Sequence, residues 1–421
     1  MAREMKDSGV EWIGQIPKGW EMKRLKNILL ERKENNNPVK TKNILSLTND
    51  RGVIPYSEKG NTGNKSKEDL TGYKLAYPND IVLNSMNIVI GSVGLSKYYG
   101  CVSPVYYMLY SNDKNIEYYN YIFQTKVFQN SLKGLGNGIL EIRMRIPMEK
   151  LNNVILPIPP LKEQEKIANY LDKKVTDIDL IIEKTKATIE NYKKYKQSII
   201  TEAVTKGLNP NVEMKETDNI HIKFIPKSWE LKKLKYLFSI KKEIAGKKGF
   251  DVLSITQKGI KIKDISTNEG QMSMDYSKYQ LLNKGDFAMN HMDLLTGWVD
   301  ISQYDGVTSP DYRVFVLNDE MKNSKAYYLY LMQICYSNRI FYGLGQGVSN
   351  LGRWRLQAEK FLNFSIPVPP LQEQKEIAEY LDKKVTEIDN LIVKKESLIN
   401  EMEEYKKSLI YECVTGKKEI I

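Results

Sequence analysis

The chain has 421 residues, and its 41% hydrophobic and 10% aromatic content is sufficient for packed cores and argues against disorder. Its 63 Lys and Arg outnumber 52 Asp and Glu, and the net charge of +11 favours a polyanionic partner, nucleic acid before an anionic membrane surface, although basic proteins are common. Three widely spaced cysteines and the lack of a long apolar run exclude a disulfide framework and a membrane-spanning helix, so we expect a cytoplasmic protein.

The first part of the chain predicts a mixed α and β domain. Its candidate strands are residues 42–48, 80–84 and 101–110, and its candidate helix is residues 118–128. Pro159 and Pro160 end the strand pattern and begin a long helix, because proline cannot donate to a strand ladder but fits the first turn of a helix. Gly207 stands where that helix should end.

The rest of the chain repeats the first part. The block LKEQEKIANYLDKKVTDIDLII that begins at Leu161 recurs as LQEQKEIAEYLDKKVTEIDNLI from Leu371. The second block again follows a Pro-Pro pair, at residues 369–370, and its helix should end at Gly416. The residues before the two helices agree only at scattered points, and those of the second copy include a candidate helix at 325–334. We therefore expect the helices to do the same work and the globular parts to do related but distinct work.

These patterns predict an α+β fold with a pseudo-twofold internal repeat, in which two mixed α/β domains are separated by two long helices that form an antiparallel coiled coil. The expected boundaries are 1–158 for the first globular domain, 159–207 for the first helix, 208–368 for a linker and the second globular domain, and 369–421 for the second helix. Both helices carry an apolar seam that needs a partner helix. The alternative, in which each helix packs on its own domain, fits a helix of roughly 65 Å poorly.

Motifs of DNA-active enzymes are not found in the sequence. Both Pro-Pro pairs follow an aliphatic residue, unlike the Asn/Asp-Pro-Pro-aromatic motif of amino-methyltransferases, and no dinucleotide-binding or ATP-binding glycine loop is present. His221 and His291 have no Cys or His at metal-ligand spacing. The glycine-rich segment 134–138 is interpreted either as a tight turn near DNA or as a plain loop. We expect no catalytic residue, cofactor or metal ion in this chain.

The motif Pro-Pro-Leu-x-Glu-Gln-x-x-Ile-Ala-x-Tyr-Leu-Asp stands at residues 159–172 and again at 369–382. With the opening segment at 7–20 and the segment 202–208 at the end of the first helix, it resembles the specificity subunits of type I DNA restriction-modification enzymes. The resemblance covers nearly the whole chain. The second helix departs mildly from it, with Cys413 where the first helix has Ala203.

The resemblance implies a non-catalytic protein that binds double-stranded DNA. Each globular domain would be a target recognition domain that reads one half of a bipartite sequence, and the coiled coil would set the gap between the halves. The helices would dock two modification subunits, which bind S-adenosylmethionine and methylate adenine, and two motor-nuclease restriction subunits, which use ATP and Mg²⁺, would complete the complex. Two alternatives remain: a single-chain DNA methyltransferase, which the missing motifs disfavour, and a coiled-coil scaffold without DNA contact, which the net charge disfavours.

Candidate DNA contacts follow a predicted strand or the glycine-rich turn in each domain. They are Asn84, Ser85, Asn87, Ser92, Lys133, Asn137, Arg143 and Arg145 in the first, and Asn290, His291, Asp293, Trp298, Gln346, Arg353 and Arg355 in the second. Asn can bond adenine at two points, and Arg suits guanine edges or phosphates. The lysines that could contact phosphate, or be ordinary solvated charges, are Lys65, Lys67, Lys258, Lys261 and Lys263. Residues that differ between the copies are expected to choose bases.

Overall fold

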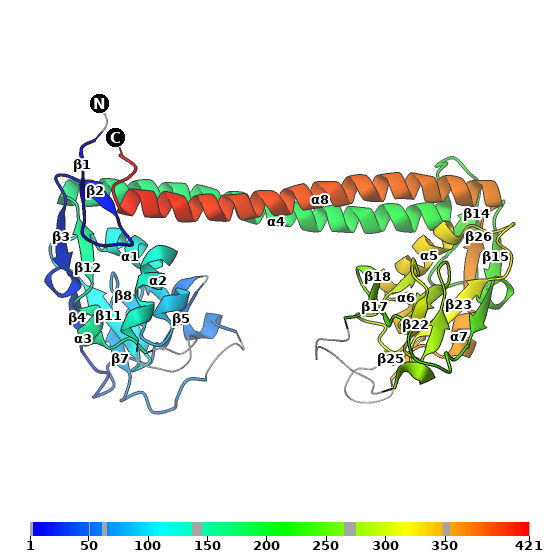
Figure 1. The fold of residues 1–421 in the computed structure, drawn as a ribbon, viewed down its shortest axis with the longest axis horizontal. Helices are drawn as coiled ribbons and strands as arrows, with labels where there is room; N and C mark the ends of the chain where they lie inside the picture. The colour runs from blue at the N-terminus through cyan, green and yellow to red at the C-terminus, as the bar shows by residue number, and fades with distance from the viewer. Residues whose placement is uncertain are drawn as a thin grey trace. The chain divides into compact units, whose positions relative to one another are not determined.

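The computed structural model describes residues 3–49, 51–60, 65–136, 145–264, 275–347 and 354–420. The chain divides into two compact units, Met1–Lys186 with Glu396–Ile421, and Ala187–Lys395. Each unit contains a mixed α and β part and portions of both long helices (Figure 1). We call residues 3–158 the first head and residues 208–368 the second head.

The first head is built around the antiparallel sheet β4-β11-β8-β9. Two-stranded ladders β1-β2, β3-β12, β5-β6 and β7-β10 surround it. The strands are β1 (Met5–Asp7), β2 (Gln15–Pro17), β3 (Glu21–Arg24), β4 (Leu30–Arg32), β5 (Leu45–Thr48), β6 (Gly52–Pro55), β7 (Lys74–Ala76), β8 (Ile81–Asn84), β9 (Val93–Leu95), β10 (Gly100–Val102), β11 (Tyr106–Tyr110) and β12 (Ile155–Ile158). The helices are α1 (Ile116–Gln124), α2 (Lys126–Ser131) and α3 (Met148–Leu151).

The second head repeats this plan around the antiparallel sheet β16-β23-β20-β21. Its ladders are β13-β14, β15-β26, β17-β18, β19-β22 and β24-β25. The strands are β13 (Met214–Glu216), β14 (Phe224–Pro226), β15 (Glu230–Lys233), β16 (Phe238–Lys241), β17 (Leu253–Thr256), β18 (Gly259–Ile262), β19 (Gln280–Leu282), β20 (Phe287–Met289), β21 (Val299–Ile301), β22 (Gly306–Thr308), β23 (Arg313–Leu317), β24 (Gln346–Gly347), β25 (Trp354–Arg355) and β26 (Ser365–Val368). The helices are α5 (Lys325–Ser337), α6 (Ile340–Leu344) and α7 (Ala358–Asn363).

The cores of the two heads are rich in aromatic residues, and helix α1 packs against β9 as α5 packs against β21. In the second head, Phe238 makes edge-to-face contacts with Phe287, Phe315 and Tyr328, with ring centres 5.4 to 5.5 Å apart. Such aromatic pairs add to the stabilisation that burial alone provides. The three cysteines are buried free thiols, as expected from the sequence.

Two predicted elements are divided in the structure. The strand predicted at 101–110 is the two strands β10 and β11, separated by a turn at Pro104, which lacks the N–H that a continuous strand would pair. The helix predicted at 118–128 is α1 and α2, because Thr125 between them has extended backbone angles. The hydroxyl of Thr125 donates to the carbonyl of Ile122 at 2.8 Å and so satisfies an acceptor at the end of α1.

The long helices are α4 (Leu161–Lys206) and α8 (Leu371–Val414), which lie side by side and antiparallel (Figure 1). In the first unit, the beginning of α4 lies with the end of α8, and in the second unit the end of α4 lies with the beginning of α8. The apolar seam is buried, for example at Ile178 and Ile399, each less than 10% exposed. The predicted antiparallel pairing is therefore confirmed, and the alternative of each helix packing on its own head alone is wrong.

Lysines that interrupt the apolar seam pair with acidic residues of the facing helix. Lys196 Nζ lies 2.5 Å from Asp389 Oδ1, and Lys406 Nζ lies 2.5 Å from Asp179 Oδ1. Each helix supplies one lysine and one aspartate, and the two pairs occupy equivalent positions of the repeat. At these two positions, the lysine in the seam forms an ion pair that joins the two helices.

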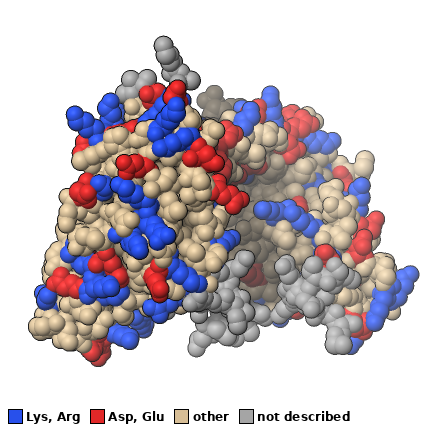
Figure 2. Space-filling model, turned by 60° about the vertical axis from the view of Figure 1, so that its left-hand side comes forward, with Lys and Arg blue, Asp and Glu red and all other residues tan. Residues whose placement is uncertain are grey.

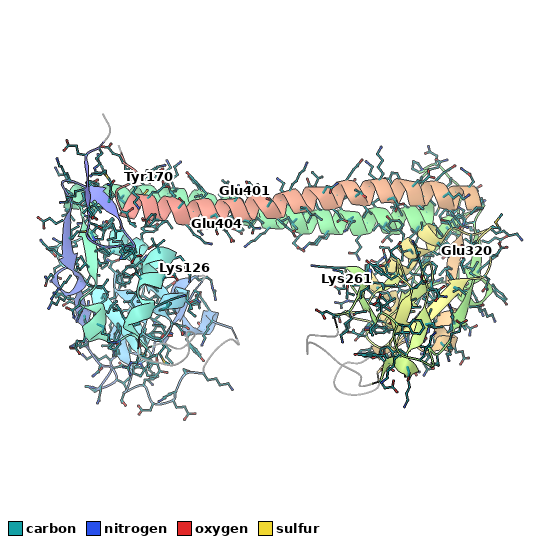
Figure 3. The ribbon with its side chains drawn as sticks, in the orientation of Figure 1. Lys126, Tyr170, Lys261, Glu320, Glu401 and Glu404 are labelled. Atoms are coloured by element: carbon teal, nitrogen blue, oxygen red, sulfur yellow. The ribbon has the colours of Figure 1, made fainter. Side chains whose placement is uncertain are left out.

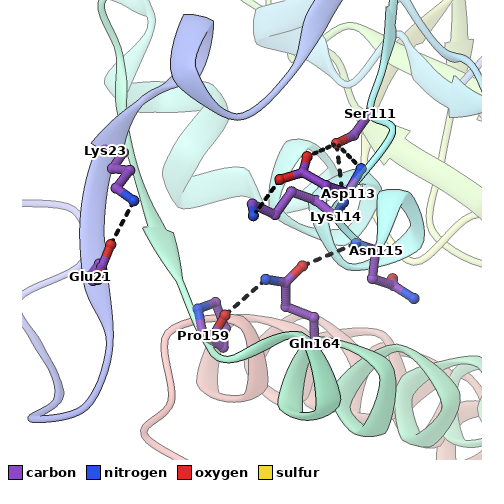
Figure 4. A network of polar contacts seen from close by, with 8 residues as sticks. All are labelled: Glu21, Lys23, Ser111, Asp113, Lys114, Asn115, Pro159 and Gln164. Atoms are coloured by element: carbon purple, nitrogen blue, oxygen red, sulfur yellow. Dashed lines mark hydrogen bonds and ion pairs between the residues drawn. The ribbon is translucent and has the colours of Figure 1, made fainter.

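Each head is attached to its own long helix by the same polar contacts. In the first unit, the indole Nε1 of Trp20 donates to Glu163 Oε2 at 2.9 Å, and in the second unit Trp229 does the same to Glu373. Gln164 bridges the start of α1 and the start of α4 by accepting from the backbone N–H of Asn115 and donating to the carbonyl of Pro159 (Figure 4). Gln374 makes the equivalent pair of bonds in the second unit.

Each head is also attached to the end of the other head's long helix. The buried hydroxyl of Tyr118 donates to the carbonyl of Val414 on α8 at 2.8 Å. The equivalent Tyr327 donates to the carbonyl of Val204 on α4 at 2.9 Å. These carbonyls stand at helix ends, where the backbone has no acceptor partner within the helix. Each head is thereby held by one terminus of each helix.

Candidate nucleic-acid interface

The candidate site begins at the loop that follows strand β8 in the first head and strand β20 in the second head. We call residues 84–92 and 290–298 the strand-end loops. The N–H of Asn84 donates to the carbonyl of Ser92 at 3.1 Å, and Asn290 donates to Trp298 at 3.0 Å, so the two loops close in the same way. The side chains of Asn84 and Asn290 each accept hydrogen bonds from backbone N–H groups two or three residues later. Both asparagines therefore shape their loops.

Two serines predicted to contact DNA in the first head are buried in its strand-end loop. Ser85 is 1% exposed and Ser92 is 4% exposed. The hydroxyl of Ser85 donates to the carbonyl of Val105 at 2.7 Å and fixes the loop to the sheet. Asn87 is half-buried, and its backbone carbonyl accepts from Ser92 at 3.2 Å. The geometry gives these residues a structural part in the loop.

In the second head, Asp293 holds the strand-end loop together. Its carboxylate accepts from the backbone N–H groups of Leu295 and Thr296 at 3.0 and 2.9 Å and from the Thr296 hydroxyl. Burial, the largest single influence, raises its pKa, but the hydrogen bonds from Thr296, Leu295 and Gly297 together bring the pKa below its ordinary value. Trp298 is half-buried, and its ring centre lies 6.3 Å from that of Tyr336.

The first head places Arg145 beside its strand-end loop. The N–H of the next residue, Ile146, donates to the carbonyl of Ser85 at 2.9 Å, and the Ile146 carbonyl accepts from the buried hydroxyl of Tyr107 at 3.2 Å. These two bonds fix the backbone next to Arg145, whose own side chain is exposed. A cation with a fixed backbone and an exposed guanidinium suits contact with a base edge or a phosphate.

The second head fixes Arg355 in the same manner. The N–H of Leu356 donates to the carbonyl of His291 at 2.9 Å, and the Leu356 carbonyl accepts from Arg313 Nη2 at 2.7 Å. The structure therefore brings the predicted loop and the predicted arginine together in both heads. Asn137, Arg143 and Arg353 lie outside the described residues.

His291 is buried among cations. It is 6% exposed, and within the described part of the chain its Nδ1 has no hydrogen-bond partner. Burial, followed by the charges of Arg313, Arg355 and Lys242, lowers the pKa of His291 to about 3, so the imidazole is neutral at ordinary pH. The sequence predicted a polar reader at this position, and the structure buries the side chain, with the His291 carbonyl accepting from the N–H of the residue after Arg355.

Sequence reasoning missed two cations near the arginines, the buried Arg313 in the second head and the half-buried Lys74 in the first. Arg313 is 5% exposed; its guanidinium lies 4.9 Å from the ring centre of Phe361, and burial lowers its pKa to about 10. Lys74 in the first head is half-buried and donates to the carbonyl of Tyr106 at 2.9 Å, and burial lowers its pKa. No motif identifies either residue, because each is distant in sequence from the arginine it adjoins.

The remaining candidates lie at the surface. Gln346 pairs with Arg355 across the β24-β25 ladder, and its side chain accepts from Gln357 at 2.7 Å.

Lys133 is exposed on a short 3-10 helix, and Lys261 projects from β18 (Figure 3). Lys65, Lys67 and Lys258 are also exposed, whereas Lys263 is less so and has an interaction partner. The visible face in Figure 2 carries Lys and Arg side chains with acidic groups between them.

A pocket of about 590 Å³ adjoins the strand-end loop of the second head. Its wall includes Asn290 and Asp293 from the loop and three aromatic rings, those of Tyr276, Tyr279 and Tyr312. Aromatic faces beside polar groups are suited to contact with bases. Over the described ranges, no group of three or more His, Cys, Asp and Glu is placed to hold a metal ion, and no helix is long and apolar enough to cross a membrane.

Comparison with known proteins shows which family the sequence matches. Residues 17–191 and 226–401, more than half of the chain, match the model of the type I restriction modification DNA specificity domain. The type I restriction enzyme MjaVIII specificity subunit of Methanocaldococcus jannaschii is 27% identical over 80% of this chain and 79% of that protein. The putative MjaX specificity subunit of the same organism is 26% identical over 96% of this chain and 95% of that protein.

The fold also has a solved counterpart. A chain from a structural study of complex assembly and conformational transition of the type I R-M system matches with a TM-score of 0.71. The match covers 96% of this chain and 99% of that chain at 12% identity. This likeness supports the arrangement of elements in the fold.

Proposed function

Because the chain belongs to the family of type I restriction-modification specificity subunits, we propose that each of its heads reads one half of a bipartite DNA target. The observation that carries the proposal is the repeated anchoring of one exposed arginine, Arg145 or Arg355, beside a strand-end loop. The anchored backbone groups are equivalent in both heads, but the side chains around the arginines differ. A shared framework with different side chains is what two readers of different sequences require.

The paired helices are proposed to set the gap between the half-sites and to dock two modification subunits. Half-site spacing in DNA readers follows from the geometry of the protein that joins the reading modules. The ion pairs Lys196–Asp389 and Lys406–Asp179 place the same charged groups at equivalent positions of the two helices, and such a repeat suits two copies of one partner. Two restriction subunits would complete the assembly.

The chemistry of methylation and cleavage is assigned to the partner subunits. S-adenosylmethionine would be bound by the modification subunits, and ATP with Mg²⁺ by the restriction subunits. The alternative of a single-chain methyltransferase has less support, because the Asn/Asp-Pro-Pro-aromatic motif and the cofactor loop are missing from the sequence.

An exchange of heads tests the proposal. Residues 20–150 are replaced by the corresponding segment of another family member, and the chain is assembled with its modification subunits. Sequencing of the methylated sites should show one half of the target changed and the other half and the gap retained. The matched control replaces residues 229–360 and should change the opposite half. If either exchange alters both halves, the assignment of one head to one half-site is wrong.

A further inference from the structure

The cation near the anchored arginine stands on a different strand in each head, with the half-buried Lys74 on β7 and the buried Arg313 on β23. Tyr107 and Arg313 occupy equivalent positions, on β11 opposite Leu83 and on β23 opposite Met289. Both donate to the carbonyl that follows the anchored arginine, at 3.2 and 2.7 Å. At this position the first head has a neutral phenol and the second head has a guanidinium.

At a neighbouring pair of equivalent positions, the charged and neutral side chains are the other way round. Lys74 is the first residue of β7 and forms an isolated β-bridge with Asn35, and Gln280 is the first residue of β19 and forms an isolated β-bridge with Ile244. Lys74 Nζ donates to the carbonyl of Tyr106 at 2.9 Å, and Gln280 Nε2 donates to the equivalent carbonyl at 2.6 Å. Here the first head has the cation and the second head has the neutral side chain.

Among the residues that the structure describes, no carboxylate forms an ion pair with Arg313 or Arg355 in the second head. Across the described residues, Arg313 has no ion-pair partner, and its hydrogen bonds go to the Leu356 carbonyl and the Met289 sulfur. Arg355 lies close enough for its charge to act on Arg313. In the first head, by contrast, burial lowers the pKa of Lys74, and the charge of Glu31 raises it by more than the charge of Arg145 lowers it. A desolvated cation without an anion favours binding of an electron-rich group beside it.

We infer that Arg313 is a positioning residue that gives the second head its preference for an electron-rich hydrogen-bond acceptor of DNA at Arg355. The acceptor is the O6/N7 edge of a guanine or a backbone phosphate, which share this chemistry. Arg313 acts through the Leu356 carbonyl, which holds the Arg355 backbone, and through its charge. The first head, with its cation on β7, presents a different pattern and reads a different group. This inference rests on the proposed function of the heads.

The test uses the chain assembled with its modification subunits and its own methylated target. Each guanine of the second half-site is replaced in turn by 7-deazaguanine, and each phosphate by methylphosphonate. One replacement should weaken binding by the wild-type complex on the order of tenfold. A deazaguanine effect identifies the base edge, and a methylphosphonate effect identifies the phosphate.

The variant Arg313→Tyr, which installs the residue of the first head, should lose this sensitivity while its thermal unfolding midpoint shows that it remains folded. Arg313→Lys, which keeps the charge, should retain part of the sensitivity of binding to the DNA replacement. Lys74→Gln is the matched control and should change sensitivity in the first half-site alone. If Arg313→Tyr keeps the full sensitivity, or if no replacement in the second half-site matters, the inference is wrong although the proposed function stands. If the wild-type complex shows no bipartite target, both fail.

Discussion

The hydroxyl of Tyr327 donates to the carbonyl of Val204 at 2.9 Å and so joins the second head to the end of α4. Both groups are buried, and Tyr327 is fully so. Tyr118 makes the equivalent bond to Val414 in the first unit. Each head is therefore held by a helix that belongs, in sequence, to the other copy of the repeat.

Replacement of Tyr327 by Phe should destabilise the second unit by about 1–3 kcal/mol, because the substitution leaves a buried carbonyl with fewer donors. Urea unfolding followed by native-state hydrogen exchange at α5 would measure the loss. Tyr328→Phe is the control, since its hydroxyl bonds the side chain of Asn323 within the same head. Equal exchange rates at the end of α4 in both variants would contradict the proposed attachment.

Replacement of Lys196 by Leu should leave the unfolding midpoint unchanged or raise it. The ion pair with Asp389 is partly exposed and therefore contributes about 0–1 kcal/mol, whereas Leu would continue the apolar seam. The reverse variant, Asp389→Leu, is less favourable because it leaves Lys196 at the seam without its partner. A marked drop in midpoint for Lys196→Leu alone would show that the pair stabilises more than its exposure suggests.

Replacement of Arg145 by Ala should weaken DNA binding and reduce the dependence of log Kd on log salt by about one unit of slope if the contact is to phosphate. Titrations of the assembled complex between low and physiological salt give that slope. The control variant is Lys18→Ala. Lys18 Nζ lies 2.8 Å from Glu4 Oε2 and does not belong to the strand-end loop. An unchanged affinity and slope for Arg145→Ala would refute the assignment.

His291 should make stability depend on pH. Its pKa is lowered to about 3 in the folded protein, so between about pH 6.5 and pH 3 the unfolded chain binds a proton that the folded chain does not. The free energy of unfolding should therefore fall on acidification, by on the order of 1 kcal/mol per pH unit from this residue. His291→Gln should flatten the profile, because it removes the group whose pKa burial lowers. Parallel profiles for His291→Gln and the wild type would contradict this burial effect.

The long helices and their pairing could be predicted because the signals are local. Pro160 precedes α4, Gly207 follows it with a positive φ of 80°, and the seam recurs at helical spacing between them. The strand-end loops and the arginines could be proposed because both copies repeat them. The sequence did not predict where some elements are divided. Periodicity alone joins β10 to β11 and α1 to α2, whereas in the structure Pro104 and Thr125 separate them.

The sequence by itself determined that the chain is a duplicated α+β protein with a shared helical part and two divergent heads. Only the tertiary structure decided which side chains surround each arginine. Lys74 and Arg313 adjoin Arg145 and Arg355 because strands distant in sequence are brought together by sheet pairing and by the bonds of Ile146 and Leu356. Such contacts depend on register between separate strands, and no spacing along the chain records that register.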